Sequence, residues 1–172
     1  MKFVIESVES KSSTATMSLS SVQAFFQSLQ LDIPILETEA NTATVALAAA
    51  AHGVEPGRIA KTLAFRLSDG REVLVVARGD ARIDNVKFKT ALGKGKMLSP
   101  DVVADITGHP VGGVCPFGLA RPLPIYLDVS LKAYEEVLPA AGSVNSAVRI
   151  SVALLEQVTQ GEWVDVCQGV AG

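Results

Sequence analysis

A lysine in an otherwise apolar strand is the first residue whose type and position suggest chemistry. Strand-forming residues run from Ile59 to Phe65. Because side chains alternate along a strand, Lys61 is expected on one face with its apolar neighbours Leu63 and Phe65. An ammonium in such surroundings needs a carboxylate, a bound anion or a route to water. The alternative is an edge-strand lysine whose amine reaches solvent, and the strand alone leaves both interpretations open.

A glycine-rich loop is the second candidate. Residues 107–118 contain four glycines and two prolines. The adjacent Gly112 and Gly113 allow positive φ and can aim consecutive N–H groups at one point, as binding of a carbonyl oxygen or an oxyanion requires. Pro110 and Pro116 would stiffen the loop. A tight turn without a ligand is the alternative, and the glycine spacing matches neither a Walker nor a Rossmann loop.

Three further residues can carry chemistry. Asp128 ends a strand, where it can orient Lys61 or bind a substrate amine, or equally cap the helix that follows. His109 and Cys115 lie in the glycine-rich loop and suggest a Cys–His nucleophile. Two such residues in one loop are weak evidence without geometry.

The composition is that of one folded domain. The chain has 172 residues, of which 48% are apolar and 19% charged, so a core can form and a largely disordered chain is excluded. Aromatic residues make up only 5%, which argues against a single-strand nucleic-acid platform of stacked rings. The longest apolar run, residues 45–51, is too short to span a bilayer, so no membrane partner is expected.

One segment is basic although the whole chain is not. The net charge of −3 excludes a generally basic nucleic-acid protein. The segment over residues 78–96 nevertheless carries six basic residues and two acids. The basic residues are Arg78, Arg82, Lys87, Lys89, Lys94 and Lys96. This asymmetry suits a phosphate backbone, and a solvated helix and loop is the alternative.

The N-terminal residues 1–17 are expected to form a loose extension before a domain over residues 18–172. Glu6, Glu9 and the lack of an apolar stretch argue against a secretory signal, so a cytoplasmic location is expected. Cys115 and Cys167 cannot build a disulfide framework and stand in no metal-ligand spacing. Neither a metal nor an organic cofactor is indicated.

Capping residues, turns and periodicity predict an irregular series of elements. The expected helices cover residues 18–29, 42–52, 85–92, 100–107, 131–137 and 152–158, and Asn41 or Thr42 caps the second. The expected strands cover residues 33–37, 59–67, 72–77, 123–128, 148–151 and 163–166, with Asp69-Gly70 as a hairpin turn. Because strand and helix do not alternate strictly, we expect a single α+β domain with a mixed curved sheet surrounded by helices.

The order of these segments resembles that of the YbaK/ProX family of bacterial aminoacyl-tRNA deacylases. The similarity runs from about Leu19 to Val166. It rests mainly on two motifs taken together, the Lys-Thr-Leu strand at residues 61–63 and the T-G-x-x-x-G-G-x-x-P-x-G loop at residues 107–118. The same domain occurs as the editing insertion of bacterial prolyl-tRNA synthetases, and the resemblance implies its fold.

The resemblance implies hydrolysis of the ester that joins a wrong, small amino acid to the 3′ end of a tRNA, with tRNA(Pro) as the expected acceptor. The family lysine corresponds to Lys61, which would hold the terminal nucleotide and the reacting ester as the catalytic residue. The loop Gly112–Pro116 would shape the aminoacyl pocket. The residues expected to bind substrate are Thr62, His109, Gly112, Gly113, Val114, Cys115, Pro116 and Asp128.

The expected partners follow from the same resemblance. The six basic residues of segment 78–96 would contact the acceptor end of the mischarged tRNA, mainly through its phosphates. Prolyl-tRNA synthetase is a further candidate partner. The oligomeric state stays open, a dimer included.

Two positions depart from the family members that remove cysteine from tRNA(Pro). Those members are associated with a serine before the glycines of the Ala-Gly loop and an acid a few residues later, where this chain has Ala140 and Ala147. The two alanines argue against cysteine as the amino acid removed and leave alanine, serine or another small amino acid open. Cys115 stands where the family often has serine, which favours lining of the pocket over nucleophilic attack.

Two other functions stay open. One is a non-catalytic tRNA- or synthetase-binding module with the same fold. The other is a thiol hydrolase in which Cys115 and His109 act on a small ester. An aminoacyl ester is itself activated, so water or a substrate hydroxyl can attack it without a protein nucleophile.

Overall fold

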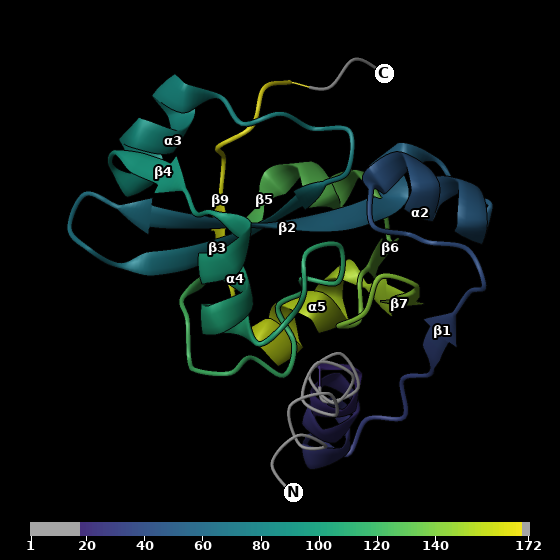
Figure 1. Cartoon of the computed structure of the whole chain (residues 1–172). Coiled ribbons are helices and arrows are strands. Elements are labelled where there is room, and N and C mark those ends of the chain that lie inside the picture. Colours follow the sequence, from purple (N-terminus) through teal and green to yellow (C-terminus); the bar gives the residue numbers. More distant parts are fainter. Residues whose placement is uncertain (1–17, 170–172) are drawn as a thin grey trace, which may run out of the picture.

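A seven-stranded mixed sheet is the centre of the computed structural model, which describes residues 18–169 (Figure 1). The strand order is β8-β6-β2-β3-β5-β9, and β4 pairs with residues 65–67 of β2. The strands are β2 (Ile59–Leu67), β3 (Glu72–Arg78), β4 (Gly95–Met97), β5 (Ile125–Asp128), β6 (Glu136–Pro139), β8 (Ile150–Ser151) and β9 (Glu162–Val164). Parallel pairs (β2 with β6, β3 with β5, β5 with β9) join antiparallel ones, as a mixed sheet requires.

The hairpin of β2 and β3 forms the middle of this sheet. The two strands pair antiparallel from Ala60 opposite Arg78 to Arg66 opposite Glu72. The five residues from Val73 to Ala77 are fully buried. Apolar clusters cover both faces of β3, so neither face is exposed to water, which explains why its sequence does not alternate.

Helices and a small second sheet cover this hairpin. The helices are one over residues 18–28, α2 (Val45–His52), α3 (Asn85–Leu92), α4 (Pro100–Thr107) and α5 (Val152–Thr159). Two 3₁₀ turns are η1 (Pro56–Arg58) and η2 (Val129–Ala133), and β1 (Ile35–Glu37) pairs with β7 (Ser146–Val148). No helix within residues 18–169 is long and apolar enough to cross a bilayer.

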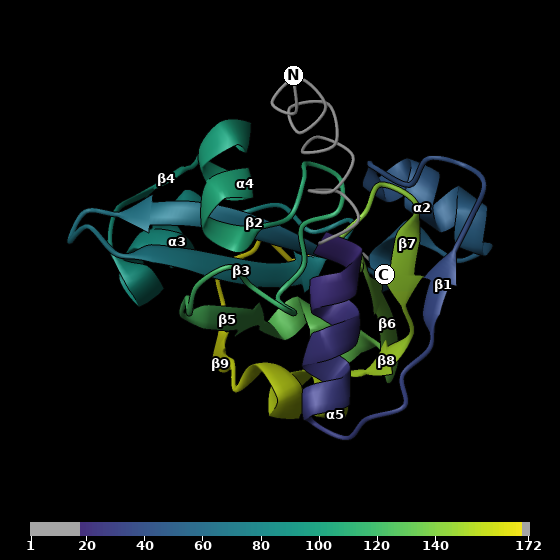
Figure 2. The same ribbon diagram turned by 60° about the horizontal axis from the view of Figure 1, so that its bottom comes forward.

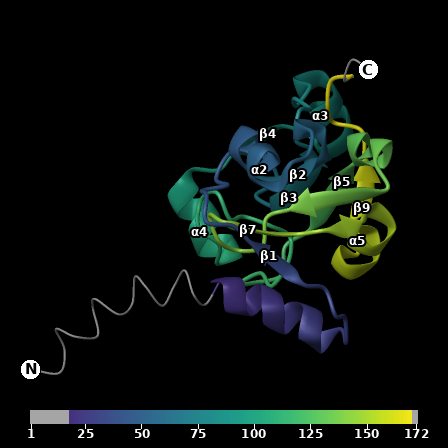
Figure 3. The same cartoon turned by 90° about the vertical axis from the view of Figure 1, so that its right-hand side faces the viewer.

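Two apolar clusters lie on opposite faces of the hairpin. On one face, Val76 packs with Phe26 of the helix over residues 18–28 and with Phe117. On the other face, Phe65 packs with Phe88 of α3, their ring centroids 4.6 Å apart. Figures 2 and 3 show the helix over residues 18–28 and α3 on opposite sides of the sheet.

Most of the expected elements are confirmed. The hairpin, α3 with its Asp84 cap, α4 and α5 lie within a residue or two of the predicted bounds. The cap of α2 is Thr44, whose hydroxyl accepts a hydrogen bond from the Leu47 N–H, so the prediction of Asn41 or Thr42 is wrong. The expected loose extension, residues 1–17, lies outside the described residues.

Two elements differ from the prediction for the same reason. Residues 131–137 are not a helix, because η2 ends at Ala133 and β6 follows, with Val137 and Leu138 buried between β8 and β2. The three-residue strand β4 was not predicted, since its exposed residues carry no apolar alternation. In both segments, pairing with distant strands decides the backbone conformation.

Asp128 has a structural role in this fold. Its carboxylate is buried and accepts hydrogen bonds from the Ser130 N–H (2.9 Å) at the start of η2 and from the Val166 N–H (2.8 Å). The alternative that Asp128 caps the next helical turn is therefore the one that the structure supports, and Lys61 is not among its hydrogen-bond partners within the described residues.

We predict that Asp128→Ala lowers the free energy of unfolding by about 3 kcal/mol, because it leaves two N–H groups without their charged acceptor. The matched control is Asp84→Ala, which removes a helix cap bonded to the N–H groups of Val86 and Lys87 and should cost about 1 kcal/mol. Urea denaturation followed by circular dichroism measures both. Equal losses in the two variants would contradict the role assigned to Asp128.

Candidate active site at the open edge of a strand

A cavity of about 260 Å³ lies beside β2. Its wall is formed by the start of α2, the middle of β2, the β4–α4 connection, the loop over residues 111–114 and residues of β6 and β7. Of the residues expected at the site, the structure brings Lys61, Thr62, Gly112 and Val114 into this one wall.

The cavity lies where β2 has no neighbouring strand. On this edge of β2, β6 pairs with Ile59 and Ala60, and β4 pairs with residues 65–67. The Leu98 N–H donates to the Ala64 carbonyl (3.0 Å), so the main-chain groups of Ala64 point to this edge. Alternate residues of a strand present their main-chain groups on the same side, so the N–H and C=O of Thr62 also point to it, into the gap. An unpaired strand edge offers both a donor and an acceptor to a ligand.

Thr62 adds a side-chain hydroxyl to these main-chain groups. Its Oγ1 is buried and has no hydrogen-bond partner within the described residues. A buried hydroxyl without a partner costs free energy, and a ligand in the cavity can supply one. Sequence reasoning selected Thr62 only through the family motif, because the open edge depends on where β4 and β6 end.

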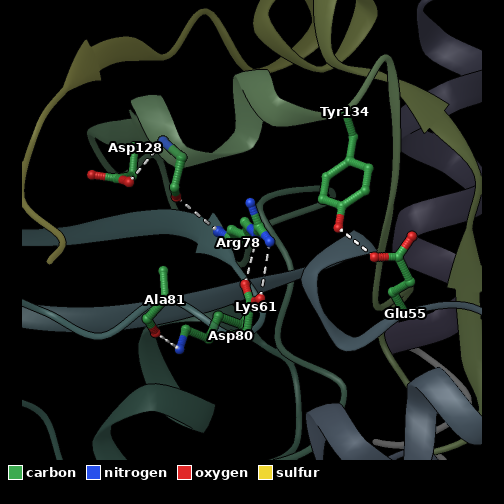
Figure 4. Close-up of polar contacts among 8 residues, drawn as sticks. Glu55, Lys61, Arg78, Asp80, Ala81, Asp128 and Tyr134 are labelled. Carbon is green, nitrogen blue, oxygen red and sulfur yellow. Dashed lines mark hydrogen bonds and ion pairs between the residues drawn. The ribbon is translucent and has the colours of Figure 1, made fainter. Parts of the chain in front are cut away.

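Lys61 borders the cavity, but its ammonium is engaged elsewhere. The side chain lies on the β2 face that carries Leu63 and Phe65, as predicted, and Nζ donates to the carbonyl of Ala81 (Figure 4). Burial lowers the pKa of Lys61 from its ordinary value, and nearby Cys167 and Asp80 act in the opposite direction. The amine thus has a main-chain acceptor in place of the carboxylate or route to water that the sequence left open.

The segment that accepts the Lys61 amine is fixed by an ion pair. The Arg78 guanidinium binds Asp80 through two hydrogen bonds, of 2.6 Å and 3.1 Å, and its carbon lies 5.2 Å from the ring centroid of Tyr134 (Figure 4). The Tyr134 hydroxyl donates to Glu55 (3.2 Å). The side chain of Arg78 is 13% exposed, so the structure gives it an internal role at variance with the expected tRNA contact.

The two glycines of the loop are needed for close approach. Gly112 has φ of +88°, and a Cβ there would lie 2.6 Å from the Ala43 Cβ. A Cβ on Gly113 would lie 2.7 Å from the Ser143 nitrogen. The Gly113 N–H donates to the Pro110 carbonyl (2.9 Å) within the turn, which corrects the expectation that it binds an oxyanion. The glycines hold the loop against its neighbours, and Gly112 lines the cavity.

His109 and Cys115 lie in the core and do not line the cavity. His109 Nδ1 is 2.5 Å from the Ser18 hydroxyl and Nε2 is 2.6 Å from the Phe117 carbonyl. Burial lowers the pKa of His109, and burial raises the pKa of the Cys115 thiol to about 12. With Nε2–H donating to Phe117, the neutral ring keeps the Ser18 hydroxyl as donor to Nδ1. The Cys115 Sγ lies 3.5 Å from His109 Nε2, but both side chains are fully buried away from the cavity, which opposes the Cys–His nucleophile and the expected contacts of both with substrate. Gly113 and Pro116 are also buried and lie outside the wall.

The two positions that depart from the cysteine-removing members face each other in the wall. Ala140 and Ala147 form an isolated antiparallel bridge, and both line the cavity. Ala48 and Ser146 lie in the same wall.

The sequence did not predict that α2 and the β4–α4 connection contribute to the cavity wall, because their apolar residues are typical of an ordinary core. Within residues 18–169, no three His, Cys, Asp or Glu side chains gather as a metal site would require.

The chain is similar to several known proteins, two of which have names that refer to aminoacyl-tRNA deacylation or editing. It is 46% identical over 154 residues to the uncharacterized protein YwhH of Bacillus subtilis, covering 88% of this chain and 98% of YwhH. It is 28% identical to a candidate Cys-tRNA(Pro)/Cys-tRNA(Cys) deacylase, EbsC of Enterococcus faecalis, over 66% of this chain and 71% of EbsC. A crystal structure of a candidate trans-editing enzyme for prolyl tRNA synthetase matches with a TM-score of 0.80 and 33% identity, over 88% of this chain and 98% of that one.

The model of one family matches most of the described chain. It is the aminoacyl-tRNA editing domain, and the match covers residues 39–158, which include β2, the glycine-rich loop and every wall of the cavity. The solved structure named above shares the α+β architecture of this chain. The chain belongs to the aminoacyl-tRNA editing domain family.

Proposed function

We propose that this protein is a trans-acting aminoacyl-tRNA deacylase that hydrolyses tRNA mischarged with a small amino acid, with tRNA(Pro) as the acceptor. The observation that carries the proposal is the cavity at the open edge of β2, where Thr62 presents a main-chain donor and acceptor next to Lys61. The names of two relatives support tRNA(Pro) as the acceptor, since one is described as acting on Cys-tRNA(Pro) and the other as a trans-editing enzyme for prolyl tRNA synthetase.

The reaction needs little beyond binding and charge stabilisation. Water attacks the ester carbonyl, the carbon–oxygen bond to the ribose breaks, and the proton of the water passes to the leaving ribose oxygen. Negative charge develops on the carbonyl oxygen, where an N–H group of the strand edge or an ammonium stabilises it. In this proposal the Lys61 amine exchanges the Ala81 carbonyl for an oxygen of the substrate, as a flexible point charge can do.

The size of the cavity supports a small acyl group. At about 260 Å³ it is below the usual range of about 300 to 1,000 Å³ for small-molecule sites. The positions of Ala48, Ala140 and Ala147 offer methyl groups and no acid, and no other residue of the wall is acidic. Alanine, serine and cysteine therefore belong in the first substrate panel, and proline serves as the correctly charged comparison.

The Ala81 contact favours one competing function. An amine already bonded to a carbonyl is also what a non-catalytic tRNA- or synthetase-binding module of the same fold would show. The thiol hydrolase lacks such support, because the Cys115 thiol is fully buried.

We predict that Lys61→Ala slows deacylation about 100- to 1,000-fold, because one transition-state donor is commonly worth that much. The assay follows loss of amino acid from tRNA(Pro) charged with alanine, serine, cysteine or proline. Lys132→Ala is the matched control, since this exposed lysine lies over the ring of Trp163, in β9. Tight binding of charged tRNA without turnover in the wild-type protein would overturn the proposal in favour of the binding module.

We also predict that neither cysteine reacts with iodoacetamide in the native protein at pH 8. Burial raises the pKa of both thiols to about 12, so little reactive thiolate is present. Mass spectrometry should find two alkylated cysteines only after denaturation, and Cys115→Ala should deacylate tRNA at the wild-type rate. Loss of activity in Cys115→Ala, together with an acyl-enzyme trapped on Cys115 of the wild-type protein, would instead establish the thiol hydrolase.

A further inference from the structure

A second and larger hollow adjoins the cavity across β4. It has a volume of about 750 Å³ and lies between α3, β4 and the beginning of α4. Met97 and Leu98 line both the hollow and the cavity. In the connection that follows, Ser99 and Val102 face the hollow, whereas Pro100 and Val103 face the cavity. The hollow and the cavity are therefore adjacent, and a ligand that reaches into both has to cross Met97 and Leu98.

The geometry points to this hollow, which we call the β4 groove, as the binding site for the sugar–phosphate backbone of a single-stranded RNA 3′ end. The inference rests on the proposed function, because it takes the acyl ester in the cavity as the end of that RNA. It names the surface over which the rest of the substrate enters.

The charge of the β4 groove fits this occupant. Its wall contains four basic residues and no acid. Lys89, Lys94 and Lys96 are exposed, and within residues 18–169 none of their amines has an ion-pair partner. The fourth, Arg66, is already bonded to Glu72 (2.7 Å). Three unpaired ammonium groups around one hollow attract phosphates.

The groove divides the basic segment 78–96 into two groups. Arg78 is bound to Asp80, and the Lys87 amine donates to Asp165 (3.2 Å) and to the Cys167 carbonyl (3.1 Å). These two side chains support the fold and do not line the groove. Lys89, Lys94 and Lys96 are the members of the segment that remain for the RNA, and Arg82 lies outside the groove wall.

The floor of the groove favours a single-stranded ligand rather than a double-stranded one. Phe88 is buried beneath it, and Met97 is 62% exposed where the groove meets the cavity. An apolar surface of this kind suits the face of an unstacked base, while the lysines suit its phosphates. Gly95 lets β4 approach closely, because a Cβ there would lie 2.8 Å from the Phe88 ring. The groove is thus held in place by packing between β4 and α3.

The test compares two double variants that remove the same charge. Lys94→Ala with Lys96→Ala alters the groove, and Lys132→Ala with Arg149→Ala alters exposed positions elsewhere. The probe is an RNA hairpin with a short unpaired 3′ extension that carries no amino acid. Fluorescence anisotropy gives its Kd over a series of salt concentrations. Because this RNA has no ester to hydrolyse, the binding result does not depend on catalysis. A wild-type protein that binds the RNA but does not deacylate aminoacyl-tRNA would overturn the proposed function and leave this inference standing.

We predict that the groove variant binds about tenfold more weakly at 0.15 M salt, with a salt slope smaller by about 1.4, because each phosphate contact to a single strand contributes about 0.7. Lys94→Arg with Lys96→Arg should bind like the wild type, and a blunt hairpin should lose the difference between the variants. Equal weakening by the control pair, or an unchanged Kd in the groove variant, would overturn the inference. Thermal unfolding of each variant checks that its fold is intact.

Discussion

The unpaired edge of β2 is the constraint on which the site depends. A buried strand normally has its main-chain groups bonded on both sides, and an open edge is a liability in a folded protein. Here β6 ends its pairing at Ala60 and β4 begins at Phe65, so the strand is open only over the few residues between them. The cavity lies at that gap, and residues of α2, the glycine-rich loop and the β4–α4 connection form its wall.

Close packing of loops closes the cavity on its other side. Gly112 and Gly113 bring the glycine-rich loop within van der Waals contact of Ala43 and Ser143, at distances that no side chain would allow. The buried pair of Ser18 and His109 holds the same loop from within the core. The glycines and the histidine thus act on the site through the position of the loop.

Local signals explain what could be predicted from the sequence. Asp69-Gly70 predicts the hairpin, Asp84 and Gly93 bound α3, and alternation places Lys61 on the correct face, because each depends on neighbours in the chain. Long-range pairing explains the rest. Three features depend on contacts with distant segments, which one sequence does not display. They are the strand conformation of residues 136–139, the Ala81 carbonyl that accepts from Lys61, and the burial of Cys115.

A crystal structure with a non-hydrolysable aminoacyl-adenosine amide tests the central claim most directly. The account predicts that the acyl group occupies the cavity, with its carbonyl or amino group within about 3.2 Å of the main chain of Thr62. It also predicts that the Lys61 amine has left the Ala81 carbonyl for the analogue. An analogue bound away from the edge of β2, with Lys61 still on Ala81, would contradict the account.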